Sequence, residues 1–107
     1  FGAGGKMTTI FQPDNCSDEA HDVAVQGDGK IVAVGVAGCD SLQMALARYD
    51  DSGLDASFGT DGMVTTGFGP RCYDWASDVV IQPDGGIVVV GSTTCTDSFV
   101  LARYLAA

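Results

Sequence analysis

The sequence predicts an all-β protein built from two tandem four-stranded antiparallel meanders. Three observations carry this prediction. The first is composition, because the 107 residues include 15 Gly and only one of the 14 acidic residues, Glu19, is a glutamate. Asp and Gly favour turns, whereas Glu favours helix interiors. The second is that no stretch keeps a 3.6-residue apolar period, so we expect no helix. The third is a hairpin pattern that occurs twice.

The hairpin pattern is an apolar run, a turn and a second apolar run. It occupies residues 20–35 and returns at residues 76–91. In the second turn Pro83 presets φ at about −65°, and Gly85 can take a positive φ. Each half of the chain is therefore expected to form a β-hairpin.

The correspondence between the halves extends over the whole chain, which indicates two repeats. Residues 1–9 align with 58–66, for example, and the segment Met-Ala-Leu-Ala-Arg-Tyr at 44–49 aligns with 99–104. We expect a first β-repeat at 1–50, a turn-rich linker at 51–62 and a second β-repeat at 63–107. The expected strands are residues 6–11, 20–26, 31–37 and 42–49, followed by 63–68, 76–82, 87–93 and 99–105.

The third strand of each repeat is apolar on both faces. A strand with one solvated face would alternate apolar and polar residues, so these runs indicate burial on both sides, as in stacked propeller blades. The phrases LDASFG, VTT, AVQGDGKIVAVG, IQPDGGIVVVG and ALARYDDSG resemble the delta-60 repeat. This resemblance implies propeller-like blades in a secreted or surface protein and supplies no catalytic site. Two blades do not close a propeller, which typically needs about 4–8.

The four cysteines predict two disulfides, Cys16 with Cys39 and Cys72 with Cys95. In a meander the loop before the second strand and the loop after the third lie at the same end of the sheet, which brings each pair together. Zinc is the alternative, but it favours cysteines separated by only about two to four residues, and no such pair occurs. Disulfides indicate an oxidising setting, so we expect an extracellular or cell-surface protein.

No pattern typical of an enzyme is present. His21 is the only histidine and aligns with Ser77, so we interpret it as an ordinary strand residue. There is no Ser-His-Asp spacing and no nucleophile elbow, and a Cys–His pair would need a free thiol. Residues 50–55 are Asp-rich but do not match an EF-hand, and Asp is also a common turn residue. We therefore predict no catalytic residues, no metal site and no cofactor.

Two further candidate sites keep two interpretations each. Asn15 begins an Asn-Cys-Ser sequon and is a candidate glycosylation site, although Asn is also an ordinary turn residue. Arg71, Tyr73 and Trp75 form a candidate contact for a glycan or another protein, since Trp and Tyr are enriched at interfaces. The alternative for these aromatic residues is that they cover a blade edge within the chain.

The charge and hydropathy of the chain narrow its partners. A net charge of −9 argues against nucleic acid, whose binding requires clustered Lys and Arg. No apolar run approaches the roughly 20 residues that span a bilayer, so we expect no membrane insertion. The sequence begins without an initiating Met, which favours a processed product or an excised piece.

Neither end of the sequence reads as a cap, and this predicts self-association. Residues 1–2 begin in the register of residues 58–59, and the chain stops before a second Asp-Ser-Gly turn. Uncapped repeat ends leave apolar surface in water, so copies are expected to join head to tail, as a filament or a ring. The expected function is that of a non-catalytic extracellular structural protein, a filament subunit. The alternatives are a glycan- or protein-binding surface module and a two-blade fragment of a longer propeller-like protein.

Overall fold

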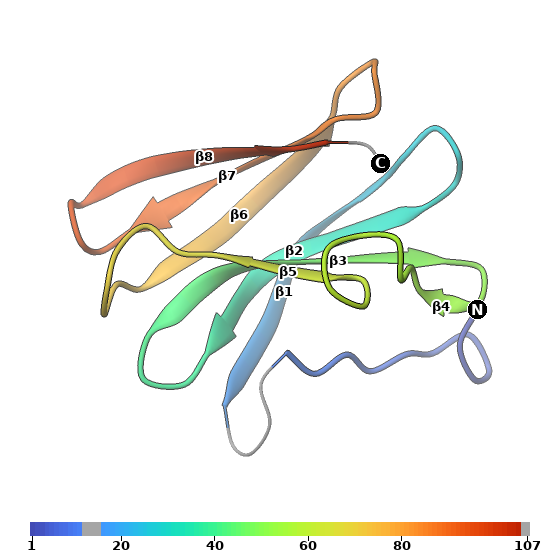
Figure 1. The fold of residues 1–107 in the computed structure, drawn as a ribbon, viewed down its shortest axis with the longest axis horizontal. Helices are drawn as coiled ribbons and strands as arrows, with labels where there is room; N and C mark the ends of the chain where they lie inside the picture. The colour runs from blue at the N-terminus through green and yellow to red at the C-terminus, as the bar shows by residue number, and fades with distance from the viewer. Residues whose placement is uncertain (12–15, 106–107) are drawn as a thin grey trace.

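Two antiparallel sheets pack against each other to form the fold (Figure 1). A computed structural model describes residues 1–11 and 16–105, and these residues contain no helix. The all-β prediction is confirmed. The strands are β1 (Ser17–Val25), β2 (Ile31–Gly38), β3 (Leu42–Asp50), β4 (Gly53–Leu54), β5 (Met63–Thr66), β6 (Asp74–Ile81), β7 (Ile87–Thr93) and β8 (Ser98–Tyr104). We call β1, β2, β3 and β5 the first blade, and β6, β7 and β8 the second blade.

Both predicted hairpins form, and their turns are built alike. The Gln26 N–H donates to the Lys30 carbonyl and the Gln82 N–H donates to the Gly86 carbonyl, each over 2.8 Å. The last turn residue has a φ of 91° at Gly29 and 90° at Gly85. Glycine takes this left-handed conformation without steric strain, so both turns depend on it.

The first strand of each repeat differs from the prediction. The strand expected at residues 6–11 does not form, and only an isolated bridge joins Ala3 to Lys6. The strand expected at 63–68 exists as β5 but pairs with β3 of the preceding repeat. The reason is the 51–62 linker, which turns the chain back antiparallel to β3. Two backbone hydrogen bonds fix this turn. The Arg48 N–H donates to the Gly62 carbonyl, and the Asp55 N–H donates to the Arg48 carbonyl. Among the described residues, no β3-like strand lies where residues 6–11 could pair in the same way.

The core lies between the two blades. It is formed by residues that are almost completely buried: Val32, Val34, Met44, Leu46, Phe58, Ala76, Val79, Ile87 and Val89. On its other side, as far as the described residues go, the first blade is covered by the N-terminal segment alone, which runs below it in Figure 1 while the second blade lies above. The molecule thus consists of three layers, and the N-terminal layer is a single segment.

A β-bulge occurs at the same position in both blades. The β1–β2 register shifts between Ala20 and Asp22, and the β6–β7 register shifts between Ala76 and Asp78. The facing residue on the next strand is glycine in each case, and a Cβ on Gly35 would collide with the Glu19 carbonyl oxygen. The bulge re-aims the side chains after it, as bulges commonly do. Here the bulge directs His21 of β1 toward the second blade.

Candidate functional site

The most informative surface is the outer side of the second blade, which we call the tail face and define by Val80, Phe99 and Leu101. Each of these side chains is more than half exposed, and Phe99 is 75% exposed. In the first blade the positions equivalent to Phe99 and Leu101 are Met44 and Leu46, and both are completely buried against the second blade. The tail face is therefore a blade-stacking surface without a blade on it.

The opposite end of the molecule carries a complementary surface. We call it the head face and define it by Val23 and Val25 of β1, which are also more than half exposed. Their equivalents in the second blade are Val79, which is buried, and Ile81, which packs against the core. A cavity of about 210 Å³ also remains between the N-terminal segment and the first blade. Head and tail faces are thus the two halves of an interface that the molecule forms once internally.

Polar contacts accompany the internal blade interface. His21 Nδ1 hydrogen-bonds to the Ala76 carbonyl over 2.7 Å, and Gln26 Nε2 donates to the Gly85 carbonyl over 3.0 Å. The hydrogen bonds to Ala76 and then Glu19 raise the pKa of His21. The sequence prediction of an ordinary strand residue missed this contact, because it depends on the bulge. On the tail face the residue equivalent to Gln26 is Gln82, whose buried Oε1 has no hydrogen-bond partner among the described residues.

Two carboxyl groups meet at the same interface. The Val79 N–H donates to Asp22 Oδ2 over 2.9 Å and to Asp78 Oδ1 over 3.1 Å. The side chains of Asp22 and Asp78 also hydrogen-bond to each other, which raises the pKa of Asp78 and lowers the pKa of Asp22. The blade interface therefore places two carboxyl groups next to each other and next to the Val79 N–H.

A buried arginine closes the first blade beside the linker. Arg48 Nε donates to Asp55 Oδ2 over 2.8 Å, and its guanidinium lies 4.6 Å from the centre of the Phe58 ring. Lys30 Nζ approaches the same carboxylate oxygen to 3.0 Å. Hydrogen bonds from Ser57, then Lys30 and Arg48, hold the pKa of Asp55 well below its usual range. In the second blade the equivalent of Arg48 is Arg103, which is exposed.

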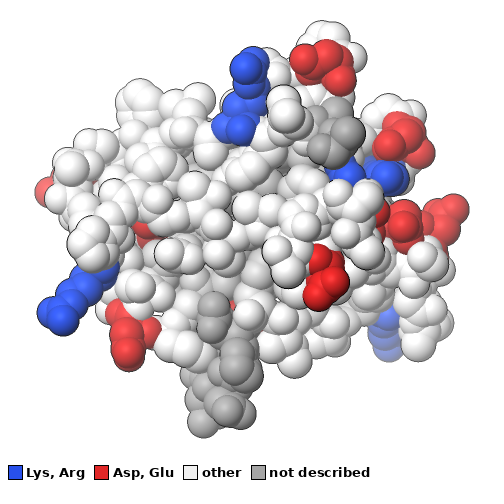
Figure 2. Space-filling view, in the orientation of Figure 1, with Lys and Arg blue, Asp and Glu red and all other residues white. Residues whose placement is uncertain are grey.

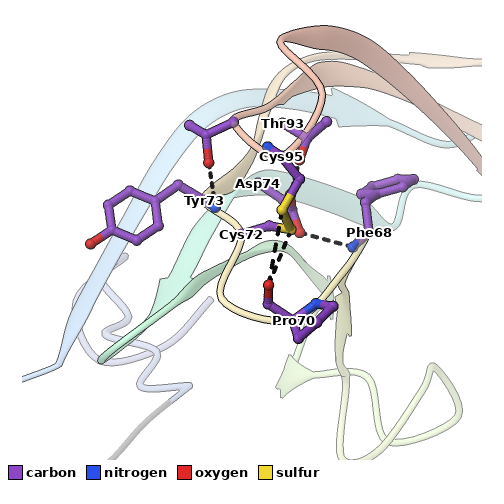
Figure 3. Close-up of a disulfide and its surroundings, with 8 residues drawn as sticks. Phe68, Pro70, Cys72, Tyr73, Asp74, Thr93 and Cys95 are labelled. Carbon is purple, nitrogen blue, oxygen red and sulfur yellow. Dashed lines mark hydrogen bonds between the residues drawn. A yellow bond between two sulfur atoms is a disulfide. The ribbon is translucent and has the colours of Figure 1, made fainter.

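Both predicted disulfides are present in the structure, with Cα–Cα distances of 4.6 Å and 5.3 Å. Beside the second one (Figure 3), the buried Asp74 accepts hydrogen bonds from the Phe68 N–H and the Thr93 hydroxyl. In the first blade Ala37 replaces the threonine, and the Asp18 Oδ1 atom is buried without a partner among the described residues. The two disulfide ends therefore differ in packing despite the same linkage.

The aromatic residues proposed as a ligand contact do not share one environment. Figure 3 shows the Tyr73 ring pointing away from the disulfide, and this side chain is about half exposed. Trp75 is partly buried within β6, and the exposed Arg71 has a φ of 58°. The candidate glycosylation residue Asn15 lies outside the described residues.

The Asp-rich linker is engaged within the protein. Asp50 accepts hydrogen bonds from both the backbone and the hydroxyl of Ser52, and Asp55 is paired as described above. In the part of the chain that the structure describes, no group of three or more His, Cys, Asp or Glu side chains is arranged to hold a metal ion.

No helix of the described residues has the length and hydropathy to cross a membrane. Figure 2 shows charged side chains near the outline of one face and mostly uncharged residues across its middle.

Comparison with known proteins gives one family match. Residues 82–106 match the family described as a β-propeller domain of unknown function, DUF5122. The match agrees with the stacked-blade geometry and supports a propeller-like repeat family, but it does not extend to the delta-60 repeat in particular. No curated protein and no solved structure gave a significant match. The head and tail faces were not identified from the sequence, although comparing aligned repeat positions after strand pairing would have found them.

Proposed function

We propose that this protein is a non-catalytic extracellular structural module that assembles head to tail into a filament. The observation that carries the proposal is the pair of exposed faces. The tail face exposes positions that pack against the core in the first blade, and the head face exposes positions that pack against the core in the second blade. Because one copy presents both halves of an interface that it already forms internally, the tail of one copy fits the head of the next.

The exposed apolar area favours such contacts. Five large side chains on the two faces are 57–75% exposed, so burying the exposed part of each contributes roughly 1–2 kcal/mol. Their sum is about 5–10 kcal/mol, which falls within the roughly 4–15 kcal/mol cost of association. Assembly is therefore expected to depend on concentration. Polar contacts equivalent to those of His21 and Gln26 would add to it.

The symmetry of the contact favours polymers. A head-to-tail contact uses two different surfaces, so a row of joined copies keeps an unused head face at one end and an unused tail face at the other. Such a contact gives a filament unless the rotation per copy closes a ring. Closure after three or four copies would give six or eight blades, within the usual range for propellers. The proposal is for the open form.

The proposed location follows from the cysteine chemistry. All four cysteines are in disulfides, which persist in oxidising compartments and are rare in the cytosol. The two bridges join residues outside the head and tail faces as defined above, and they cross-link each blade.

A pair of surface variants tests the proposal. Leu101→Asp places a charge in the tail face, and Val25→Asp places one in the head face. Each variant alone is expected to be a single copy by multi-angle light scattering at concentrations where the unmodified protein grows with concentration. Mixed together, the two variants should form a one-to-one dimer, because each retains the surface that the other lacks.

The control is Tyr73→Ser, which removes an exposed aromatic outside both faces and should leave assembly unchanged. If the unmodified protein stays a single copy at concentrations of tens of micromolar, head-to-tail assembly is overturned altogether. A discrete trimer or tetramer would overturn the filament and favour the ring. Dimerisation of Val25→Asp on its own would indicate a symmetric tail-to-tail contact instead.

A second candidate is a blade pair within a longer propeller, and the β-propeller family match favours it. In that case flanking repeats of the same polypeptide would cover the head and tail faces. The mass of the protein from its native source separates the candidates. A subunit of about 11.0 kDa supports the filament, and a multiple of that mass supports the longer propeller.

A further inference from the structure

The outer edge of β8 is an unpaired strand edge. In the first blade, β3 pairs with β2 on one side and with β5 on the other. In the second blade, β8 pairs with β7, and no described strand occupies its other side. Such an edge presents backbone N–H and C=O groups that can pair with another chain. The second blade therefore lacks the fourth strand that the first blade has.

The N-terminal residues repeat the segment that supplies this fourth strand. Residues 58–66 contain a turn followed by β5, and residues 1–9 contain the same turn. Reciprocal backbone hydrogen bonds link Ala3 with Lys6 at 3.0 and 3.3 Å, and Thr60 with Met63 at 3.0 and 3.1 Å. The φ values also correspond: 59°, 63° and 80° at Gly2, Gly4 and Gly5, against 55°, 55° and 90° at Gly59, Asp61 and Gly62. The turn is therefore already formed before any strand pairs with the residues after it.

The segment also sits on the first blade as β5 sits on the second. The Thr9 and Tyr49 hydroxyls are 2.7 Å apart, matching the hydrogen bond between the Thr66 and Tyr104 hydroxyls. The Phe11 N–H donates to Asp18 over 3.0 Å, as the Phe68 N–H donates to Asp74 over 2.9 Å. Residues 6–11 thus lie where the fourth strand of a preceding blade would lie. No rearrangement is required for them to receive that blade.

We infer that residues 6–9 of one copy add to β8 of a neighbouring copy as an antiparallel fourth strand. This inference rests on the proposed head-to-tail assembly and specifies its partner and register. The β3–β5 pairing transfers directly, since it joins Met44 to Thr66 and Ala47 to Met63. The expected pairs are Thr9 with Phe99, Thr8 with Val100, Met7 with Leu101 and Lys6 with Ala102.

The same superposition brings an aromatic ring to an exposed arginine. Phe58 stacks on Arg48 at 4.6 Å, and their equivalents are Phe1 and Arg103. In the assembled pair, Phe1 of one copy lies over Arg103 of its neighbour. A cation over an aromatic face is an attractive contact, and burial strengthens it. The donated segment thereby covers both the strand edge and the charged end of β8.

Single cysteine substitutions test the register. A protein with Met7→Cys is mixed with a protein that has Leu101→Cys, and oxidative formation of a covalent dimer is followed on non-reducing gels. Directly opposed strand residues have Cβ atoms close enough for a disulfide, whereas a one-residue shift points the side chains to opposite faces. The matched control is therefore Thr8→Cys mixed with Leu101→Cys. We expect the first mixture to cross-link at least about tenfold faster than the second.

The possible results separate this inference from the proposed function. Preferential cross-linking of the first mixture supports strand addition in the stated register. Assembly by light scattering with equal or no cross-linking in both mixtures overturns strand addition and leaves head-to-tail stacking intact. Absence of any assembly overturns both. Amide hydrogen exchange on the unmodified protein is the second measurement, and assembly should slow exchange in residues 6–9 and 98–104 together. Protection confined to the blade faces would contradict the inference.

Discussion

Arg48 and Arg103 occupy equivalent positions in the two repeats, but the same substitution is expected to affect stability very differently at the two sites. Arg48 is buried, ion-paired to Asp55 at 2.8 Å and stacked on Phe58. Arg103 is exposed. Arg48→Ala should therefore destabilise the fold strongly, whereas Arg103→Ala should leave the stability of a single copy nearly unchanged.

The magnitude follows from what each substitution leaves behind. Removing one member of a buried ion pair costs about 3–5 kcal/mol, because the remaining charge is buried without compensation. Lys30 stays 3.0 Å from the Asp55 carboxylate and offsets part of that cost, so we expect about 3 kcal/mol for Arg48→Ala. An exposed substitution such as Arg103→Ala changes stability by about 0.5 kcal/mol or less.

Chemical and thermal unfolding at pH 7 measure both effects. The protein is kept dilute enough to be a single copy, since assembly would add its own stabilisation. A loss of about 3 kcal/mol corresponds to a drop in Tm of roughly 12–24 °C for a domain of this size. Asp55→Asn in the Arg48→Ala background should recover part of the loss, because it removes the uncompensated charge. Equal and small effects at Arg48 and Arg103 would refute the reasoning that the linker closes only the first blade.

Three other perturbations have defined outcomes. Replacing both cysteines of either disulfide by Ala should cost about 3 kcal/mol in the chain-entropy model, measured by urea unfolding; no loss would show that the bridge is redundant. Gly35→Ala should prevent normal folding because its Cβ would collide with the Glu19 carbonyl, whereas Gly27→Ala, with open space around it, should fold normally by circular dichroism. Asp78→Asn should stabilise the protein near neutral pH, because it removes repulsion from Asp22. Because the pKa of Asp78 is raised in the folded protein, its contribution to stability is present below about pH 3.8 and is lost as pH rises through the folded pKa. Over that interval the unfolding free energy of Asp78→Asn should fall less than that of the unmodified protein. Parallel pH profiles of the two proteins would contradict this prediction.

The head and tail faces could not be predicted from the sequence, for a specific reason. Val80, Phe99 and Leu101 alternate with other residues just as their buried equivalents do, so their pattern predicts a strand face without saying whether anything covers it. The same holds for Val23 and Val25 of β1. Exposure became assignable only when the stacking order of the blades was known. The pairing of His21 with the Ala76 carbonyl likewise required the bulge and the neighbouring blade together.

The sequence by itself determined the local elements. The Gly29 and Gly85 turns, the apolar runs around them and the repeated cysteines are short-range or repeat-level signals, and they predicted both hairpins and both disulfides. These features depend on φ preferences and on residues brought together by a single hairpin. They needed no knowledge of the rest of the molecule.

Only the tertiary structure decided which strand completes which blade. Residues 6–9 and 63–66 carry similar sequences, yet β5 is paired and the N-terminal segment is not. Both segments end in two threonines, which favour strands, but a strand also needs an available edge beside it. For β5 the linker supplies the edge of β3, whereas no described strand edge lies beside residues 6–9. Pairing is a property of two segments, so one repeat read alone cannot fix it.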